Sequence, residues 1–194
     1  MANADKPNGF TPIGTLSGSD YHGKLRRVAF AAGDSTAAYV GDLVKLTGTV
    51  DATGKIPVVA QSAAGDASIG VLVSLDPDPS DEGSLMTPLT RAASTARTGQ
   101  VAFGQDVLYV IQEDSVGNDI EITEAGLNCD VIVGSGSDVT GSGMELDSDT
   151  AASTSSLNVR LHHVYDAPDN ALGTNARWVV SINASQEALN QTGV

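Results

Sequence analysis

Turn-forming residues interrupt this chain so often that helices of ordinary length do not fit between them. Glycine accounts for 21 of the 194 residues, against a usual share of about 7%. The apolar residues between the turns form short runs rich in valine and isoleucine, which is typical of strands. The sequence therefore predicts an all-β protein, either a compact β-barrel or a β-sandwich, with little helix.

The individual strands can be placed from these runs. Residues 69–75 are almost continuously apolar, which predicts a central strand buried on both faces. The short run 56–60 contains Pro57 and is expected at a sheet edge, because proline cannot donate to a ladder. Further strands are predicted over residues 25–31, 38–46, 101–111, 119–122, 129–133, 157–165 and 177–183, and one short helix over 185–191.

Two of these strands alternate between apolar and polar residues. In residues 177–183 the alternation turns Trp178, Val180 and Ile182 to one face, so we expect them to anchor the core or a subunit interface. In residues 157–165 it puts His163 on the apolar face and His162 on the opposite one. Two histidines on opposite faces of a strand cannot both bind one metal ion.

Residues 1–24 differ from the rest of the chain. Isolated apolar residues lie among prolines and glycines, and this spacing favours neither a helix nor a regular strand. We expect an extended N-terminal arm that lies on its own domain or on a neighbouring chain, followed by a β-rich domain over residues 25–194. The candidate contact residues of the arm are Phe10, Pro12, Ile13, Leu16 and Tyr21.

A long polar segment, from Gly134 to Ser156, interrupts the β-rich domain. Its glycine and serine content predicts a long flexible loop. Since compact domains rarely hold loops of this length, the segment is functional, mobile, or contains a short hairpin around residues 144–146.

The charge excludes one class of partner. The formal net charge is −14, with −2 in the first hundred residues and −12 in the remainder. Binding to nucleic acid depends on clustered lysine and arginine, so we expect no nucleic-acid partner. No apolar run approaches the roughly 18 residues of a membrane span, so we expect no membrane partner and synthesis in a host cytoplasm.

Sequence signatures of catalysis are absent. The chain has no phosphate-binding loop, dinucleotide fingerprint, nucleophile elbow or zinc-protease helix. Cys129 is the only cysteine, which excludes an intrachain disulfide and a cysteine-based zinc site. The acidic segment from Asp76 to Gly83 is expected to be a solvated loop, with a weak cation site as the alternative. We therefore expect no enzyme, no cofactor and no metal centre.

Two segments resemble the decoration, or cement, proteins of tailed-bacteriophage capsids. One begins with Met1-Ala2-Asn3 and continues as PNGFTPIGTLSG over residues 7–18; the other is DAPDNALGTNARWVVSIN over residues 166–183. The Gly41-Asp42 strand entry and the run 69–75 extend the likeness. The resemblance implies a β-rich structural protein that forms a trimer or dimer on the outer surface of the virion. It would bridge major capsid subunits and stabilise the shell.

A second interpretation remains open. The chain is then a non-catalytic β-sandwich that binds carbohydrate or a host surface and is displayed on a virion. Such sites commonly present exposed aromatic rings, and the chain has eight aromatic residues in all.

Overall fold

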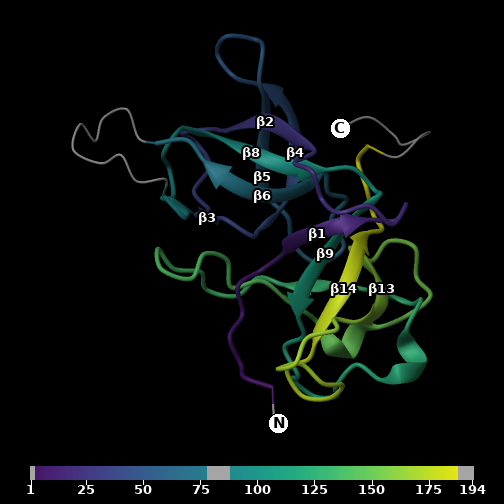
Figure 1. The fold of residues 1–194 in the computed structure, drawn as a ribbon. Coiled ribbons are helices and arrows are strands. Elements are labelled where there is room, and N and C mark those ends of the chain that lie inside the picture. The colour runs from purple at the N-terminus through teal and green to yellow at the C-terminus, as the bar shows by residue number, and fades with distance from the viewer. Residues whose placement is uncertain (1–2, 78–87, 188–194) are drawn as a thin grey trace.

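The computed structural model describes residues 3–77 and 88–187, and it confirms the all-β prediction (Figure 1). Five strands close into a barrel in the order β2-β5-β4-β6-β8, and five others form an open sheet beside it in the order β1-β9-β14-β13-β10. In the described part of the chain no helix is long and apolar enough to cross a membrane.

The barrel strands are β2 (Leu25–Phe30), β4 (Leu43–Val50), β5 (Pro57–Gln61), β6 (Gly70–Leu75) and β8 (Arg97–Phe103). The sheet strands are β1 (Thr11–Thr15), β9 (Val107–Gln112), β10 (Asn128–Cys129), β13 (Val159–Val164) and β14 (Arg177–Ile182). Two small pairs join β3 (Ala38–Tyr39) to β7 (Thr90–Arg91) and β11 (Val131–Ile132) to β12 (Glu145–Leu146), and the 3-10 turns are η1 (Ile122–Glu124) and η2 (Ser148–Thr150).

Strand β6 supplies side chains to both hydrophobic cores. Val71 belongs to the core under the open sheet, whereas its neighbour Leu72 belongs to the core of the barrel. Successive residues of a strand point to opposite faces. Because apolar neighbours cover both faces of β6, the run is apolar throughout, as the sequence predicted for a central strand.

The N-terminal segment is part of the folded domain. Thr11–Thr15 pairs with β9 as strand β1, so the expectation of no regular strand in residues 1–24 is wrong there. Just before it, the backbone passes so close to Gly41 that a Cβ on Gly9 would lie 2.5 Å from the Gly41 carbonyl oxygen. The arm therefore lies on its own domain, held by backbone pairing that side-chain spacing does not show.

Five other strand predictions need correction. The predicted strand 38–46 is two strands, β3 and β4, separated at Gly41, and 129–133 is divided between β10 and β11. β5 pairs with both β2 and β4 and is not an edge strand; Pro57 is its first residue, where its missing N–H is not needed. Residues 101–111 are split at Gly104, whose φ of 112° turns the chain. Residues 119–122 form no strand, and the 3-10 turn η1 begins at Ile122.

The segment 134–156 contributes one strand of a hairpin around residues 144–146. Its strand β12 pairs antiparallel with β11, which lies just before the segment, with Ile132 opposite Glu145. Met144 and Leu146 are completely buried in the core under the sheet. Of the three interpretations of this segment, the hairpin is the one that the structure contains. The predicted helix over 185–191 lies mostly outside the described residues.

Candidate functional site

The five candidate arm residues have different environments. Phe10 is only 3% exposed and packs edge-on against Tyr109, with ring centroids 6.0 Å apart. Pro12, Ile13 and Tyr21 are half-buried, and Leu16 is 55% exposed. Phe10 is therefore a core residue, and Leu16 is the arm residue most available for contact with another chain.

The apolar face predicted for residues 177–183 lies in the core. Trp178 is 1% exposed, and Val180 and Ile182 are buried with it under the sheet. The Trp178 indole Nε1 has no hydrogen-bond acceptor in normal geometry within the described chain. Of the two interpretations, core anchor and subunit interface, the burial within one chain fits the core anchor.

The two segments that carry the resemblance meet in the open sheet. Strands β1 and β14 both pair with β9, one on each side (Figure 1). Ahead of β1, the Asn3 side chain donates to the carbonyls of Ala171 and Thr174, at 2.8 and 2.9 Å, and accepts from Ala171 N–H at 2.9 Å. Residues from opposite ends of the sequence thus belong to one sheet and are bonded to each other at Asn3.

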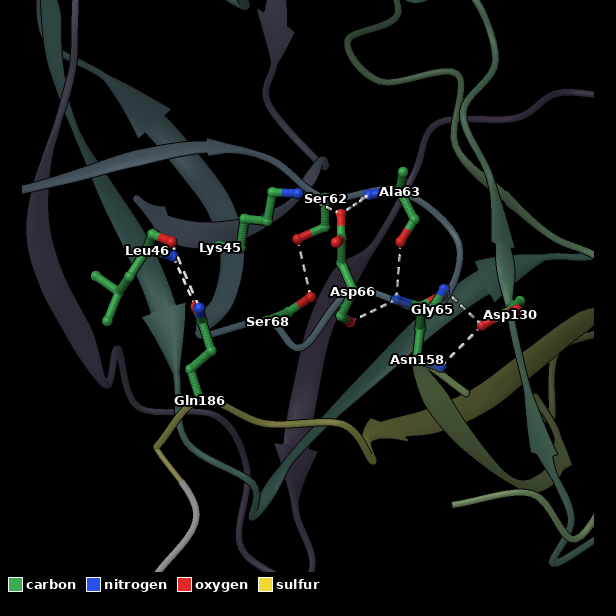
Figure 2. Close-up of polar contacts among 10 residues, drawn as sticks. All are labelled: Lys45, Leu46, Ser62, Ala63, Gly65, Asp66, Ser68, Asp130, Asn158 and Gln186. Atoms are coloured by element: carbon green, nitrogen blue, oxygen red, sulfur yellow. Dashed lines mark hydrogen bonds and ion pairs between the residues drawn. The ribbon is translucent and has the colours of Figure 1, made fainter. Parts of the chain in front are cut away.

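A polar junction joins the barrel to the open sheet (Figure 2). Its centre is Asn158, which has no exposed surface. The Asn158 Nδ2 donates to the carbonyls of Ala63 and Asp66, at 3.1 and 2.9 Å, and Oδ1 accepts from the N–H groups of Gly65 and Val131. One buried amide therefore bonds the loop between β5 and β6 to the sheet side of the molecule.

Further contacts extend this junction toward the C-terminal segment (Figure 2). Lys45 Nζ lies 2.6 Å from Asp66 Oδ2. The Gln186 side chain bonds both backbone groups of Leu46, accepting from its N–H at 2.6 Å. The barrel is thus bonded to the sheet and to the chain that follows β14, so the two parts form one connected unit.

Two glutamates have strongly raised pKa values. Burial raises the pKa of Glu113 to about 7, partly opposed by N–H donors from Ile120 and Ala176; the Trp178 indole lowers it slightly, although no hydrogen bond of normal geometry joins them. Burial, with repulsion from Asp5 and Asp114, raises the pKa of Glu145 to about 7.

A carboxyl group with a pKa near 7 is suited to acid–base chemistry, but the surroundings of Glu113 are structural. Its side chain has no exposed surface, and its two oxygens hold the backbone at Ile120 and Ala176. No group of three or more His, Cys, Asp or Glu side chains within residues 3–77 and 88–187 is arranged to hold a metal ion.

The histidines reverse their predicted positions. His163 is exposed, whereas His162 is half-buried and its Nε2 lies 2.9 Å from Ser181 Oγ. The pairing of β13 with β14 shifts register between Leu161 and His163. Such a bulge reverses the alternation that follows it, which explains the error.

Cys129 is a structural residue. It is buried, and burial raises the pKa of its thiol to about 12, as expected for a packing residue.

Asp76 is bonded to two neighbouring side chains. Its Oδ2 accepts from Arg27 at 3.1 Å and from Thr98. Most of the acidic segment proposed as a cation site, residues 78–83, lies outside the described residues.

Two surface cavities differ in chemistry. A mostly apolar groove of about 530 Å³ lies at one end of the barrel, with Phe30, Val50 and Val58 in its walls. A polar cavity of about 310 Å³ lies beside the N-terminal segment, with Lys6 and Arg177 in its walls. No sequence motif pointed to either cavity, because each combines residues from distant segments.

Comparison with known proteins gives no relative: no protein-family model, curated protein or solved structure matches the chain.

Proposed function

We propose that the protein is a capsid decoration protein. It binds the outer surface of a phage head as a homotrimer or homodimer, bridges major capsid subunits and stabilises the shell. The observation that carries the proposal is the meeting of residues 7–18 and 166–183 in one sheet, on either side of β9. The two segments that resemble decoration proteins thus belong to one sheet.

The polar contacts between the barrel and the open sheet support this role. The buried Asn158 amide connects the loop between β5 and β6 to the sheet side, and the Lys45–Asp66 ion pair holds that loop to β4 within the barrel. A protein that bridges subunits must transmit load between its contacts without unfolding locally. Two cores joined by buried hydrogen bonds suit that task, because opening either part breaks polar contacts that are costly to leave unsatisfied.

The charge also suits an outer surface. With a net charge of −14 the protein is repelled by packaged DNA and by other copies that are not specifically docked. The contacts with the capsid would come from half-buried and exposed residues of the arm, Pro12, Ile13, Leu16 and Tyr21. Phe10 would hold the arm in position from the core.

The carbohydrate-binding alternative receives less support. All eight aromatic residues lie in the described part of the chain, and none of them is exposed. Tyr165 is covered by the Arg177 guanidinium, 5.8 Å from the ring centre. A sugar would find no open aromatic ring to stack on.

The test is binding to undecorated heads of the phage that encodes the chain. Purified protein is mixed with such heads and sedimented, and the bound copies per capsid subunit are counted. We expect saturation at a fixed simple ratio and heads that resist heat or low salt better when decorated. Leu16→Ser, which changes an exposed arm residue, should weaken binding, whereas Val116→Ser, an equally exposed change away from the arm, should not. Absence of saturable binding to these heads would overturn the proposal.

A further inference from the structure

The polar cavity beside the N-terminal segment has the features of a binding site. It has a volume of about 310 Å³ and lies between the first described residues, the end of β9 and the start of β14. The side chains in its walls include Asn3, Lys6, Asn8, Asp169, Asn175 and Arg177.

The cavity brings together two cations in a strongly acidic protein. Arg177 is one of only two basic residues after position 100, and Lys6 comes from the other end of the chain. The Lys6 amine forms no ion pair with any residue in the described ranges. With Asp169 as the one acid in the walls, the cavity carries a formal charge of about +1, and a concave surface of one sign attracts the opposite charge.

The Arg177 guanidinium is positioned by two neighbouring side chains. Its Nη2 lies 2.6 Å from Asp169 Oδ1, and its Cζ lies over the Tyr165 ring. An arginine side chain has five N–H donors in a planar fork. Within the described residues the contact with Asp169 is the only hydrogen bond of this side chain, so the other donors are available to a bound group.

The walls of the cavity are fixed by other amides. Asn3 bonds the loop at Ala171 and Thr174. The Gln112 side chain accepts from Lys6 N–H at 3.1 Å and donates to the Ala4 carbonyl at 3.2 Å. Asn3 and Gln112 thus use their hydrogen bonds to shape the cavity.

Two other asparagines, Asn8 and Asn175, also line the cavity. Their side chains make no hydrogen bond to any residue of the described chain. Together with the Lys6 amine and the remaining Arg177 donors, they line the cavity with donors that have no acceptor among the described residues. This arrangement favours an anion that accepts several hydrogen bonds.

We propose that this cavity binds a carboxylate, namely the side chain of an aspartate or glutamate on a partner protein. A carboxylate offers two coplanar oxygens that match the guanidinium fork, and its single negative charge balances the formal charge of the cavity. A neutral sugar leaves that charge unbalanced, and a phosphate dianion exceeds it. The proposal does not depend on the partner being a capsid protein.

The test uses sodium acetate as the probe of a carboxylate site. The full-length protein, labelled with ¹⁵N, is titrated with acetate at constant ionic strength, with sodium chloride as the reference salt. Parallel titrations use N-acetylglucosamine and inorganic phosphate. Lys6→Gln removes one cation from an exposed side chain that forms no ion pair with the described residues. Lys55→Gln is the matched control, because Lys55 is also exposed and forms no ion pair within residues 3–77 and 88–187.

We expect saturable acetate shifts confined to the amides of Asn8, Gln112, Asn175 and Arg177. Lys6→Gln should weaken acetate binding about threefold to fivefold, the ratio set by one partly exposed ion pair, and Lys55→Gln should not change it. The Lys6→Gln/Arg177→Gln double variant should lose the shifts while keeping the dispersed spectrum of a folded protein. Shifts that survive the double variant, tighter binding of N-acetylglucosamine or phosphate, or no saturable acetate shift would each overturn the proposal. Head binding is measured separately, so the two proposals fail independently.

Discussion

The guanidinium of Arg91 is completely buried and lies 3.3 Å from the carboxylate of Asp34, measured from Nη1 to Oδ2. The same guanidinium donates to the carbonyls of Ala31, Thr36 and Thr95, and it lies over the Phe30 ring at 5.5 Å. One side chain from β7 therefore closes the loop that follows β2. A buried cation is stable only when its donors are satisfied in this way.

Arg91→Ala should destabilise the protein by about 3 to 5 kcal/mol, because it removes a fully buried side chain and the donor shared by the partly buried Asp34 carboxylate and three backbone carbonyls. Chemical denaturation followed by circular dichroism measures the change. Arg160→Ala is the control: Arg160 is exposed and its side chain makes no hydrogen bond or ion pair with the described residues, so its effect should stay within about 0.5 kcal/mol. Equal midpoints for the two variants would contradict the structural role of Arg91.

Phe10 and Leu16 test whether the N-terminal segment belongs to the domain. Phe10→Ala removes a buried ring and should cost about 3 to 5 kcal/mol, whereas Leu16→Ala changes an exposed residue and should cost less than about 0.5 kcal/mol. Deletion of residues 1–20 removes β1 and should prevent folding. A truncated chain with the circular dichroism and melting temperature of the parent would show that β1 is dispensable.

Trp178→Ala should lower the free energy of unfolding by about 3 to 5 kcal/mol, because it opens a cavity in the core under the sheet. Trp178→Phe keeps most of the apolar volume and removes an indole N–H that has no acceptor in normal geometry, so it should cost much less. Urea midpoints for both variants check the order. Coincident midpoints for Trp178→Ala and the parent would contradict the burial.

Asn158→Ala should cost about 2 to 4 kcal/mol, because it takes a buried partner from the Asp66 carbonyl and the Val131 N–H at the junction of barrel and sheet. The Ala63 carbonyl and the Gly65 N–H each keep one other partner, Asp66 N–H and Asp130 Oδ1. Amide hydrogen exchange should therefore rise first at Val131. Asn118→Ala is the comparison, since among the described residues the exposed Asn118 side chain bonds only Asp149. Unchanged exchange at Val131 would show that the junction does not depend on this amide.

Stability should fall as the pH rises from about 5 to 8. The pKa values of Glu113 and Glu145 are raised to about 7 from an ordinary value of 4.5, so the folded state retains protons that the unfolded chain loses. Their contribution is complete below about pH 4.5 and is lost as the pH passes 7. Melting temperatures across this range measure the trend.

Glu145→Gln separates one contribution to this pH dependence. The variant should be more stable than the parent at pH 8 and should show a shallower decline, because the ionised carboxylate near Asp5 and Asp114 is gone. At low pH, Asp51 changes stability in the opposite direction. Hydrogen bonds from Ile56 and Thr53 lower its pKa to about 2, so its ionised form stabilises the folded state. Its contribution is lost only as the pH falls from about 4 through 2. A parent protein that gains stability between pH 5 and 8 would contradict these assignments.

Much of the fold was predictable from local pattern. Ile69, Val71, Leu72 and Leu75 of the run 69–75 are buried as predicted, and so are Trp178, Val180 and Ile182. Along β14 burial does not follow the two-residue period, because Val179 and Ser181 on the other face are buried as well. The pattern failed where backbone pairing overrides it. A register shift reversed His162 and His163, and β1 formed from residues that do not alternate, because its stability comes from pairing with β9 and from Phe10 in the core.

The sequence by itself determined the fold class, the central strand β6 and the acidic charge, since each depends on composition or on neighbours a few residues apart. Only the tertiary structure decided which residues meet across long separations. It brought Asn158 to the loop at Gly65, Arg91 to Asp34 and Lys6 to the cavity of Arg177. Such contacts depend on the path of the whole chain, and no local period encodes them.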